Sequence, residues 1–327
     1  MAAGNTAIAT PSEYTSASTI ELAKLSELAG FPPGVINVVT GYSSEVGEPL
    51  VAHKKVKKIA FTGGEEGGRK VNIAGAADFK KVTLELGGKS ANIVFDDADL
   101  DQALNGVISG IFAASGQTCI AGSRLLLQDS IHDEFVDRLV EIAKTAQLGN
   151  PMSEDTQIAP IATEPQYRKI LAYIDIAKAE GARCVLGGGP GEAAGKHQGL
   201  FVLPTIFVDV NNGMRIAQEE VFGPVLSVIR FKDEAEAIAI ANDVDYGLAA
   251  GVWSKSLDRA INVSERLQAG TVWVNTYRST SYTSPFGGYK SSGLGRENGQ
   301  EAIKDYLQVK SIWLHTGEVT KNPYARR

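Results

Sequence analysis

Cys119 is the residue of this sequence best suited to nucleophilic chemistry. It lies in the small-residue segment 112–123, read FAASGQTCIAGS, which leaves room for a substrate to approach the backbone. A thiol with a reference pKa of about 8.5 is a few per cent ionised at neutral pH, and its thiolate is strongly nucleophilic. A lone cysteine is more often a small buried hydrophobic residue, and Cys184, within an apparent strand, keeps that interpretation.

Glu85 is the candidate general base. It lies in the apolar run 82–90, read VTLELGGKS, where a charged side chain is costly to bury without a partner. Partial burial raises a carboxyl pKa towards the working pH, as general-base catalysis requires. An outward-facing strand residue is the alternative. The adjoining Gly87 and Gly88 favour the catalytic interpretation because they permit close approach of a cofactor or substrate.

A glycine-rich turn at residues 61–68, read FTGGEEGG, lies between an expected strand and an expected helix. Free backbone N–H groups at a helix start suit a pyrophosphate, although the turn is not G-x-G-x-x-G and is weak evidence alone. A serine or cysteine hydrolase would need a histidine base. The histidines all fall in expected surface helices, loops or the tail: His53, His132, His197 and His315. The spacing typical of metal ligands is absent from the sequence.

The segments before residue 90 alternate between strand and helix patterns. The expected strands are Thr6–Ala9, Val35–Thr40, Lys58–Phe61 and Val82–Leu86, and the expected helices are Ser16–Ala29, Ser44–His53 and Arg69–Ala76. This alternation predicts βαβ crossovers and a doubly wound parallel sheet. The consecutive apolar residues of 35–40 predict a strand covered on both faces.

A second α/β region is expected from about Gly88 to Lys290. Its expected helices are Leu100–Ala114, Asp133–Thr145, Gln166–Glu180, Glu234–Ala241 and Leu257–Leu267, and its strands are Arg124–Gln128, Cys184–Leu186, Val225–Phe231 and Thr271–Val274. The stretch 187–199 has no Gly-Lys-Ser/Thr ending and is expected to be a surface loop. The apolar run 312–314 would form an exposed edge unless another chain covers it.

Composition places the chain among ordinary globular proteins. A length of 327 residues suits about two domains, with 43% hydrophobic and 21% charged residues. The net charge of −6 gives no basic surface for nucleic acid. Two cysteines exclude a disulfide framework and favour a reduced, cytoplasmic setting. The uncharged run 102–123 is long enough to span a membrane, but its polar residues and glycines favour a buried helix that continues into a loop. No secretory signal pattern is visible at the start.

In their order along the chain, these segments resemble the aldehyde dehydrogenase superfamily, from the first residues to about Leu314. The segment 84–91, read LELGGKSA, is similar to the family's glutamate signature, and 112–123 is similar to its cysteine signature. Glu85 and Cys119 lie 34 positions apart, as in the family. Further matching segments are 4–6 (GNT), 11–13 (PSE), 61–63 (FTG), 219–224 (EEVFGP), 273–275 (WVN) and 285–293 (PFGGYKSSG).

The resemblance implies an α/β fold with a partial Rossmann-type parallel sheet and a second α/β catalytic domain. It assigns residues 1–86 to an N-terminally incomplete NAD-binding domain, 87–290 to the catalytic domain, and 291–327 to a C-terminal return segment and oligomerisation strand. Family members carry a long section before the segment that matches Gly4. That section supplies one strand of the cofactor domain, an arm of the oligomerisation hairpin and the asparagine that is the second oxyanion donor. A homodimer or homotetramer is expected if the complete fold is present.

The resemblance also implies NAD(P)-dependent oxidation of a small aldehyde to a carboxylic acid. The Cys119 thiolate would add to the carbonyl carbon, hydride would leave to the nicotinamide, and a thioester would remain. Glu85 would activate the hydrolytic water, while the backbone N–H of Cys119 would hold the oxyanion. Two alternatives stay open. One is a catalytically silent fragment or binding partner, and the other is an acylating enzyme that passes the thioester to coenzyme A.

The resemblance places the cofactor as well. Glu220 matches a position that contacts the nicotinamide ribose, and Phe222 packs near the same end. The other implied cofactor positions are Thr62, Gly63, Gly64, Gly68, Leu86, Gln166 and Lys169. Glu13 matches an acidic residue near the adenosine ribose, which favours NAD over NADP.

Two departures bear on cofactor binding: Thr10 replaces a frequent family lysine, and Gly64 replaces a serine that touches the pyrophosphate. By family position, Tyr277, Arg278 and Tyr282 would line the substrate passage. No metal site, nucleic-acid partner or membrane partner is expected.

Overall fold

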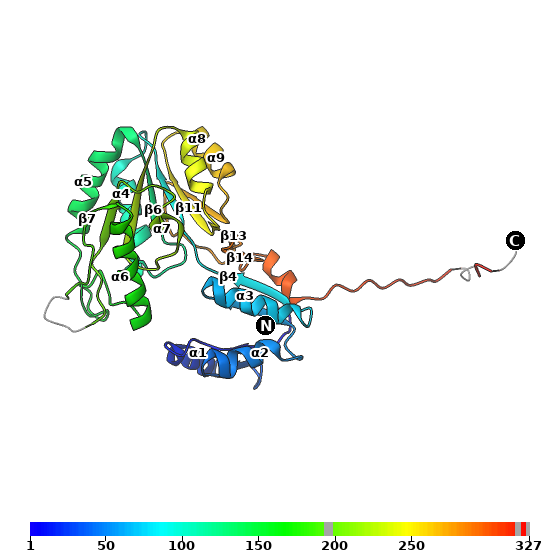
Figure 1. Cartoon of the computed structure of the whole chain (residues 1–327). Helices are drawn as coiled ribbons and strands as arrows, with labels where there is room; N and C mark the ends of the chain where they lie inside the picture. Colours follow the sequence, from blue (N-terminus) through cyan, green and yellow to red (C-terminus); the bar gives the residue numbers. More distant parts are fainter. Residues whose placement is uncertain (193–198, 318–321, 325–327) are drawn as a thin grey trace.

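The computed structural model describes residues 1–192, 199–317 and 322–324. Its larger part is built on a seven-stranded sheet with the strand order β12-β11-β5-β6-β9-β8-β7 (Figure 1). Neighbouring strands are parallel except for the edge pair of β7 and β8. The strands are β5 (Ala91–Val94), β6 (Arg124–Gln128), β7 (Arg183–Leu186), β8 (Thr205–Val208), β9 (Val225–Phe231), β11 (Ala249–Trp253) and β12 (Thr271–Val274).

Helices cover both faces of this sheet because each strand directs alternate side chains to opposite sides. On one face, Leu125 and Leu127 of β6 join the buried residues of α4 (Leu100–Phe112) and α5 (His132–Ala143). On the other face, Leu126 packs with α6, α7, α8 and α9. These helices are α6 (Glu164–Ala179), α7 (Arg215–Gln218), α8 (Glu234–Asn242) and α9 (Leu257–Arg266). The α/β class expected from the sequence is therefore confirmed.

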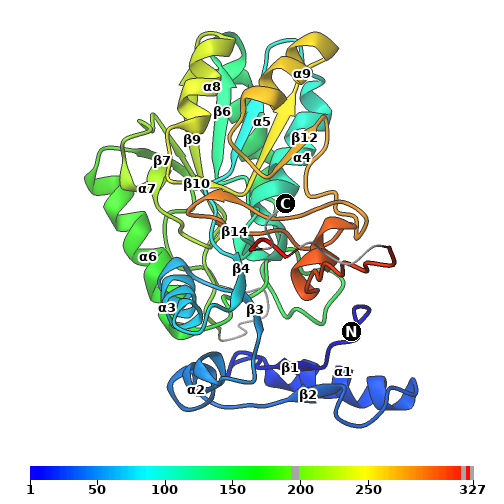
Figure 2. The ribbon, with the colours of Figure 1, turned by 90° about the vertical axis from the view of Figure 1, so that its right-hand side faces the viewer.

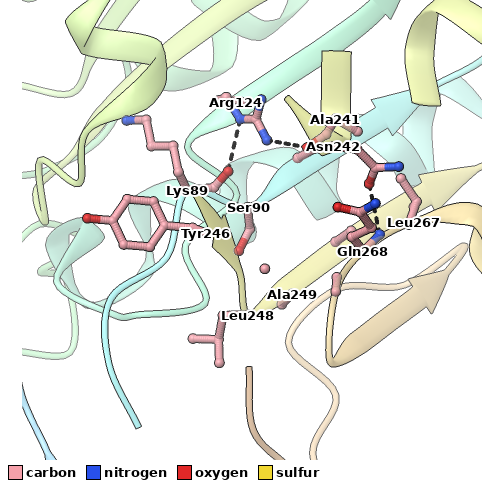
Figure 3. Close-up of a pocket in the computed structure, with 14 residues that line it drawn as sticks. Lys89, Ser90, Arg124, Ala241, Asn242, Tyr246, Leu248, Ala249, Leu267 and Gln268 are labelled. Carbon is pink, nitrogen blue, oxygen red and sulfur yellow. Dashed lines mark hydrogen bonds between the residues drawn. The ribbon is translucent and has the colours of Figure 1, made fainter. Parts of the chain in front are cut away.

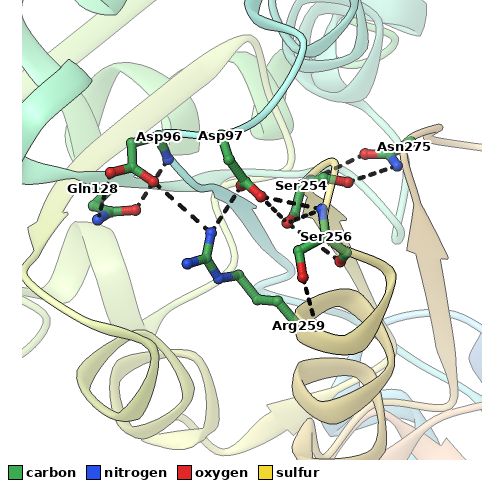
Figure 4. A network of polar contacts seen from close by, with 7 residues as sticks. All are labelled: Asp96, Asp97, Gln128, Ser254, Ser256, Arg259 and Asn275. Carbon is green, nitrogen blue, oxygen red and sulfur yellow. Dashed lines mark hydrogen bonds and ion pairs between the residues drawn. The ribbon is translucent and has the colours of Figure 1, made fainter.

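A polar network closes the carboxyl ends of β5, β11 and β12 (Figure 4). The Asp97 carboxylate accepts hydrogen bonds from the Ser254 hydroxyl at 2.9 Å and the Ser256 N–H at 3.1 Å. It also pairs with Arg259 at 2.9 Å, which fixes the start of α9. The Asn275 amide exchanges two hydrogen bonds with the Ser254 backbone. Cys119 comes just before β6. The candidate catalytic cysteine therefore lies at the opposite end of the sheet, where the parallel strands begin.

A smaller three-stranded sheet carries Glu85. Strands β3 (Lys58–Thr62) and β4 (Lys81–Glu85) are parallel, and β14 (Gly293–Leu294) adds antiparallel to β4. Helix α3 (Glu65–Ala76) packs against this sheet. A separate parallel pair, β1 (Ala7–Ala9) and β2 (Ile36–Val38), packs with α1 (Ser16–Leu28) (Figure 2). The chain passes from β2 through the π-helix Ser43–Gly47 and α2 (Glu48–Ala52) to β3.

Several expectations for residues before 90 are wrong. The first four strands form two small sheets rather than one doubly wound sheet, and β14, far along the chain, joins the second. Strand β2 is half-buried rather than covered on both faces, and within the described residues its partner is β1. Helix α3 begins at Glu65 rather than Arg69, because Gly64 provides the N-cap.

The C-terminal part pairs with β10 (Tyr246–Gly247) in a separate two-stranded sheet and then joins the three-stranded sheet before it leaves the body. Strand β13 (Tyr289–Lys290) pairs with β10, β14 follows, and a 3-10 helix spans Glu301–Tyr306. Residues 307–317 then extend away without a strand or helix (Figure 1). Ile312, Trp313 and Leu314 are all exposed, so the expected oligomerisation strand has no strand partner among the described residues.

Two remaining expectations concern histidines and a membrane span. His132 is buried at the start of α5 with Nδ1 2.8 Å from an Asp133 oxygen, so its expected surface position is wrong. Residues 193–198 of the expected 187–199 loop, which include His197, lie outside the described residues. Within the described ranges, no helix combines the length and apolar character needed to cross a membrane.

Candidate active site

Glu85 is the last residue of β4, between Thr62 of β3 and Gly293 of β14. It is 4% exposed, and neither carboxylate oxygen has a hydrogen-bond partner among the described residues. The pKa of Glu85 is raised to about 8, mainly by burial and also by the charge of Glu297, while Arg296 acts in the opposite direction. A buried carboxyl group that ionises near neutral pH has the property required of a general base.

Gly287, within the segment 285–293, covers Glu85 from the C-terminal part. Its φ of +152° is disfavoured for residues with a side chain, and a Cβ there would lie 2.8 Å from Glu85 Oε1. A glycine at this position therefore lets the returning chain pass directly over the carboxylate.

The segment that carries Cys119 is fixed by an unusual turn after α4. Ala114 and Ser115 both have a φ of +53°, a conformation that costs free energy in non-glycine residues. The Ser115 hydroxyl offsets part of this cost, since it donates to the Ala159 carbonyl at 2.8 Å and accepts from the Ala159 N–H at 3.0 Å. The Gln117 side chain accepts from the Ala162 N–H at 2.9 Å. The turn is thus held in a defined position before the cysteine.

Cys119 itself is half-buried. Burial raises the pKa of its thiol, and the carboxylates of Glu220 and Glu85 raise it further. The two predicted catalytic residues therefore lie within electrostatic range of each other. Cys184 lies on the edge strand β7, with Sγ 3.2 Å from the Leu186 carbonyl.

Gly87 and Gly88 join the end of β4 to the cysteine segment and to Glu220. The Gly88 N–H donates to Glu220 Oε1 at 3.0 Å, and a Cβ on Gly87 would lie 2.7 Å from Glu220 Oε2. On its other side, Gly88 lies against the carbonyl oxygen of Cys119. Two predicted catalytic residues and one predicted cofactor residue thus meet around two glycines.

The predicted cofactor residues of α6 support the Glu220 segment. The Gln166 amide donates to the carbonyls of Val221 at 2.8 Å and Phe222 at 2.9 Å. Phe222 has a φ of +57°, so these bonds hold a strained residue. Lys169 acts on Glu220 through its positive charge, which opposes the rise in the Glu220 pKa caused mainly by burial.

The glycine-rich turn lies beside Glu85. The Gly63 N–H donates to the Glu85 carbonyl at 3.1 Å, and Gly64 begins α3. Gly68 packs against Leu86, since a Cβ would lie 2.6 Å from Leu86 Cδ2. Thr62, at the end of β3, is exposed. This glycine-lined start of a helix fits a pyrophosphate by shape and by the direction of its N–H groups.

Three other predicted residues lie apart from this group. Glu13 is exposed in the turn between β1 and α1, and Tyr282 is 86% exposed. Tyr277 is buried beneath the cysteine segment, where its hydroxyl donates to the Ile120 carbonyl at 3.0 Å. Tyr277 supports the cysteine segment from the core, and a substrate contact for either tyrosine stays a prediction.

Lys89 and Arg124 are charged residues of this region that the sequence reasoning missed. Lys89 is 1% exposed, and its Nζ has no hydrogen-bond partner within the described part of the chain. The pKa of Lys89 is lowered to about 7, mainly by burial and also by the charge of Arg124. The Arg124 guanidinium donates to the Lys89 carbonyl at 2.9 Å and to the Ala241 carbonyl at 2.7 Å. Both residues line a small pocket that includes neither Cys119 nor Glu85 (Figure 3). The sequence Gly-Gly-Lys-Ser at residues 87–90 could have drawn attention to Lys89, because this lysine directly follows the two glycines near Glu85.

Comparison with known proteins identifies the family. The model of the aldehyde dehydrogenase family matches residues 1–312. The chain is 48% identical to an aldehyde dehydrogenase of Emericella nidulans, covering 97% of this chain and 63% of that protein. It is 47% identical to a betaine aldehyde dehydrogenase of Mesorhizobium japonicum, covering 99% and 66%.

Solved structures agree with these relatives. Betaine aldehyde dehydrogenase from Staphylococcus aureus in complex with NAD+ has a TM-score of 0.95 at 42% identity, covering 98% of this chain and 64% of that one. The NAD-dependent aldehyde dehydrogenase from Sinorhizobium meliloti has a TM-score of 0.93 at 42% identity, covering 97% and 62%. The chain spans just under two thirds of the length of the relatives it matches. The match along nearly all of its own length shows that this chain belongs to the aldehyde dehydrogenase family.

Proposed function

We propose that this protein is an NAD-dependent oxidoreductase that converts an aldehyde to a carboxylic acid through a thioester on Cys119. The observation that carries the proposal is the meeting of Glu85, Cys119 and Glu220 around Gly87 and Gly88. A nucleophile, a base with a pKa near 8 and a predicted cofactor contact are the components that this chemistry needs. The relative of known structure that binds NAD+ supports the choice of cofactor.

The chain's own residues account for each step. The Cys119 thiolate attacks the carbonyl carbon and forms a C–S bond, while its backbone N–H holds the developing oxyanion. NAD, when bound, would supply a hydride acceptor, and loss of hydride from the thiohemiacetal carbon would leave a thioester on Cys119. Glu85 takes a proton from water, and the resulting hydroxide attacks the thioester. The C–S bond then breaks to release the acid and the Cys119 thiolate, and the proton held by Glu85 can return to this thiolate or pass to solvent. The burial of Glu85 within electrostatic range of Cys119 supports this role.

The cofactor assignment rests on the turn and on the Glu220 segment. In the proposal, residues 1–86 form the NAD side, 87–290 the catalytic side, and 291–327 the return and oligomerisation segment. The pyrophosphate would lie at Thr62, Gly63, Gly64 and Gly68, with Leu86 behind them, and the nicotinamide end near Gln166, Lys169, Glu220 and Phe222. The Glu13 carboxylate would accept a hydrogen bond from the free 2′-hydroxyl of the adenosine ribose. This favours NAD, because NADP carries a phosphate at that position.

The exposed segment 312–314 supports a homodimer or homotetramer in which a second copy covers it. A reduced, cytoplasmic setting is proposed from the two free cysteines. Light scattering of the purified chain, compared with Trp313→Ser, tests the oligomer. A lower molecular mass for the variant would support an interface at residues 312–314. An unchanged mass would contradict it.

The activity test follows NADH formation with betaine aldehyde and with a short aliphatic aldehyde, each with and without coenzyme A. We expect NADH and free acid without coenzyme A, loss of both in Cys119→Ala by at least about 10³-fold, and retention in the control Cys184→Ala. A product that requires coenzyme A would favour the acylating alternative. Absence of NAD binding and NADH in every arm would favour a catalytically silent chain.

A further inference from the structure

A hydrogen bond joins the start of α3 to strand β10, within electrostatic range of Glu220. The Tyr246 hydroxyl, on β10, donates to Glu65 Oε2 at 3.3 Å across 181 positions of sequence. Glu65 is the first residue of α3 and also pairs with Arg69 one turn later. In Figure 3 the Tyr246 hydroxyl and the Lys89 amine point to the same side, away from the small pocket. The Glu65 carboxylate is therefore held between α3 and β10.

This position brings Glu65 into electrostatic range of Glu220. The pKa of Glu220 is raised mainly by burial, and the charge of Glu65 raises it further, while Lys169 and Lys89 oppose the rise. The pKa of Tyr246 is likewise raised by burial and then by the carboxylates of Glu65 and Glu220. The charges of Glu65 and Glu220 therefore act on each other beside the residues that the proposed function assigns to the cofactor.

The first turn of α3 is the region where the proposed function places the cofactor's pyrophosphate. Helix N-termini favour a negative charge, and a pyrophosphate uses that preference. Here the first position of the helix already holds a carboxylate, which is fixed from both sides by Tyr246 and Arg69. A second anion at the same helix end is repelled by the first, most strongly at low ionic strength.

We propose that Glu65 lowers the affinity of the protein for the pyrophosphate of the dinucleotide. Tyr246 is the positioning residue that holds the Glu65 carboxylate in place. This inference rests on the proposed function, because it needs the pyrophosphate to lie at the start of α3. Release of NADH is aided by the same repulsion. The neighbouring Glu66 serves as a matched control, since its side chain is 85% exposed and pairs with Lys70 on the same helix.

Calorimetric titration of the purified chain with NAD and, separately, with inorganic pyrophosphate tests the proposal. Glu65→Gln keeps an acceptor for Tyr246 but removes the charge, and we expect both probes to bind about fivefold to tenfold more tightly than to the wild type. Glu66→Gln should stay within about twofold. The gain in Glu65→Gln should shrink as salt rises from about 0.02 to about 0.5 M. Tyr246→Phe should give a smaller gain of about twofold to threefold, because the carboxylate is then free to turn away.

The outcomes separate this inference from the proposed function. Equal affinity of wild type and Glu65→Gln for NAD would overturn the role of Glu65 while leaving NAD binding intact. An equal gain in affinity for Glu66→Gln would also overturn the role of Glu65. The loss of any negative charge near the helix start would then explain the tighter binding. If no variant binds NAD but inorganic pyrophosphate still binds more tightly to Glu65→Gln, the proposed cofactor is overturned, while repulsion of a pyrophosphate by Glu65 is supported. Failure of both probes with every variant overturns both. Thermal unfolding of each variant confirms that it is folded.

Discussion

The carbonyl oxygen of Cys119 packs so closely against Gly88 that a Cβ at residue 88 would lie 2.5 Å from it. The same glycine donates its N–H to Glu220 at 3.0 Å and follows Glu85 by three positions. The end of β4 therefore sets the position of the cysteine segment directly. Packing at this one backbone position couples the proposed nucleophile, base and cofactor contact.

The first prediction concerns Gly88→Ala. The added methyl group must push the Cys119 carbonyl away, so we expect kcat/KM for aldehyde oxidation to fall by about 10²-fold. The free energy of unfolding should fall by about 1–3 kcal/mol. Gly189→Ala is the control, because a Cβ there meets nothing within 4 Å. Wild-type kinetics in Gly88→Ala, measured as NADH formation, would show that this contact does not position the cysteine.

The second prediction concerns Glu85 and the pH dependence of stability. Its pKa is about 8 in the folded chain against an ordinary value of 4.5, so the folded state keeps a proton that the unfolded state loses. Below about pH 4.5 this group does not change the free energy of unfolding. The free energy of unfolding falls as pH rises towards about 8, and above that pH it stays at its lowered value. Glu85→Gln should gain stability relative to wild type over this range, by a few kcal/mol at most. Urea unfolding at several pH values measures the gain, and a difference independent of pH would contradict the buried, proton-holding carboxyl group.

The third prediction concerns Gln166, which donates to the carbonyls of Val221 and Phe222. Gln166→Ala leaves these carbonyls without that donor, so Glu220 loses its support and NAD affinity should fall about fivefold to tenfold. Gln102→Ala, at the exposed start of α4, is the control and should bind NAD as the wild type does. Calorimetric titration with NAD measures both. Equal affinity in the two variants would remove Gln166 from the cofactor site.

The fourth prediction concerns the support beneath Cys119. Tyr277→Phe removes a buried hydrogen bond to the Ile120 carbonyl and should lower the free energy of unfolding by about 1–2 kcal/mol. Iodoacetamide should also alkylate Cys119 faster, because the segment is held less firmly. Tyr282→Phe is the exposed control and should stay within about 0.5 kcal/mol of wild type. No difference between the two variants would argue against a supporting role for Tyr277.

Strong local patterns made part of the fold predictable. Strands β6, β9 and β12 have the bounds that the sequence predicted, because each is a short segment rich in apolar residues between loop or turn residues. Strand β5 was missed, since Ala91–Val94 is short and includes the polar Asn92. That asparagine is buried because the Trp253 indole donates to it at 2.7 Å from 161 positions away. No local pattern encodes such a partner.

The candidate site divides in the same way. Glu85, Cys119 and Glu220 could be proposed from the sequence because each lies in a compact family motif. The contact of Glu65 with Tyr246 was not predicted, because it joins helix α3 to strand β10 across 181 positions of sequence. The buried His132 was placed on the surface because its helix position shows no local sign of burial. Distant packing partners, rather than local propensity, determine these features.

The central claim is that Cys119 forms a thioester that Glu85 then hydrolyses. Its most direct test is intact-protein and peptide mass spectrometry of Glu85→Gln, quenched in acid after mixing with NAD and an aldehyde. We predict one equivalent of NADH in an initial burst, little steady turnover, and an acyl group on the peptide that contains Cys119. An acyl group on Cys184, no adduct at all, or wild-type steady turnover in Glu85→Gln would contradict the account.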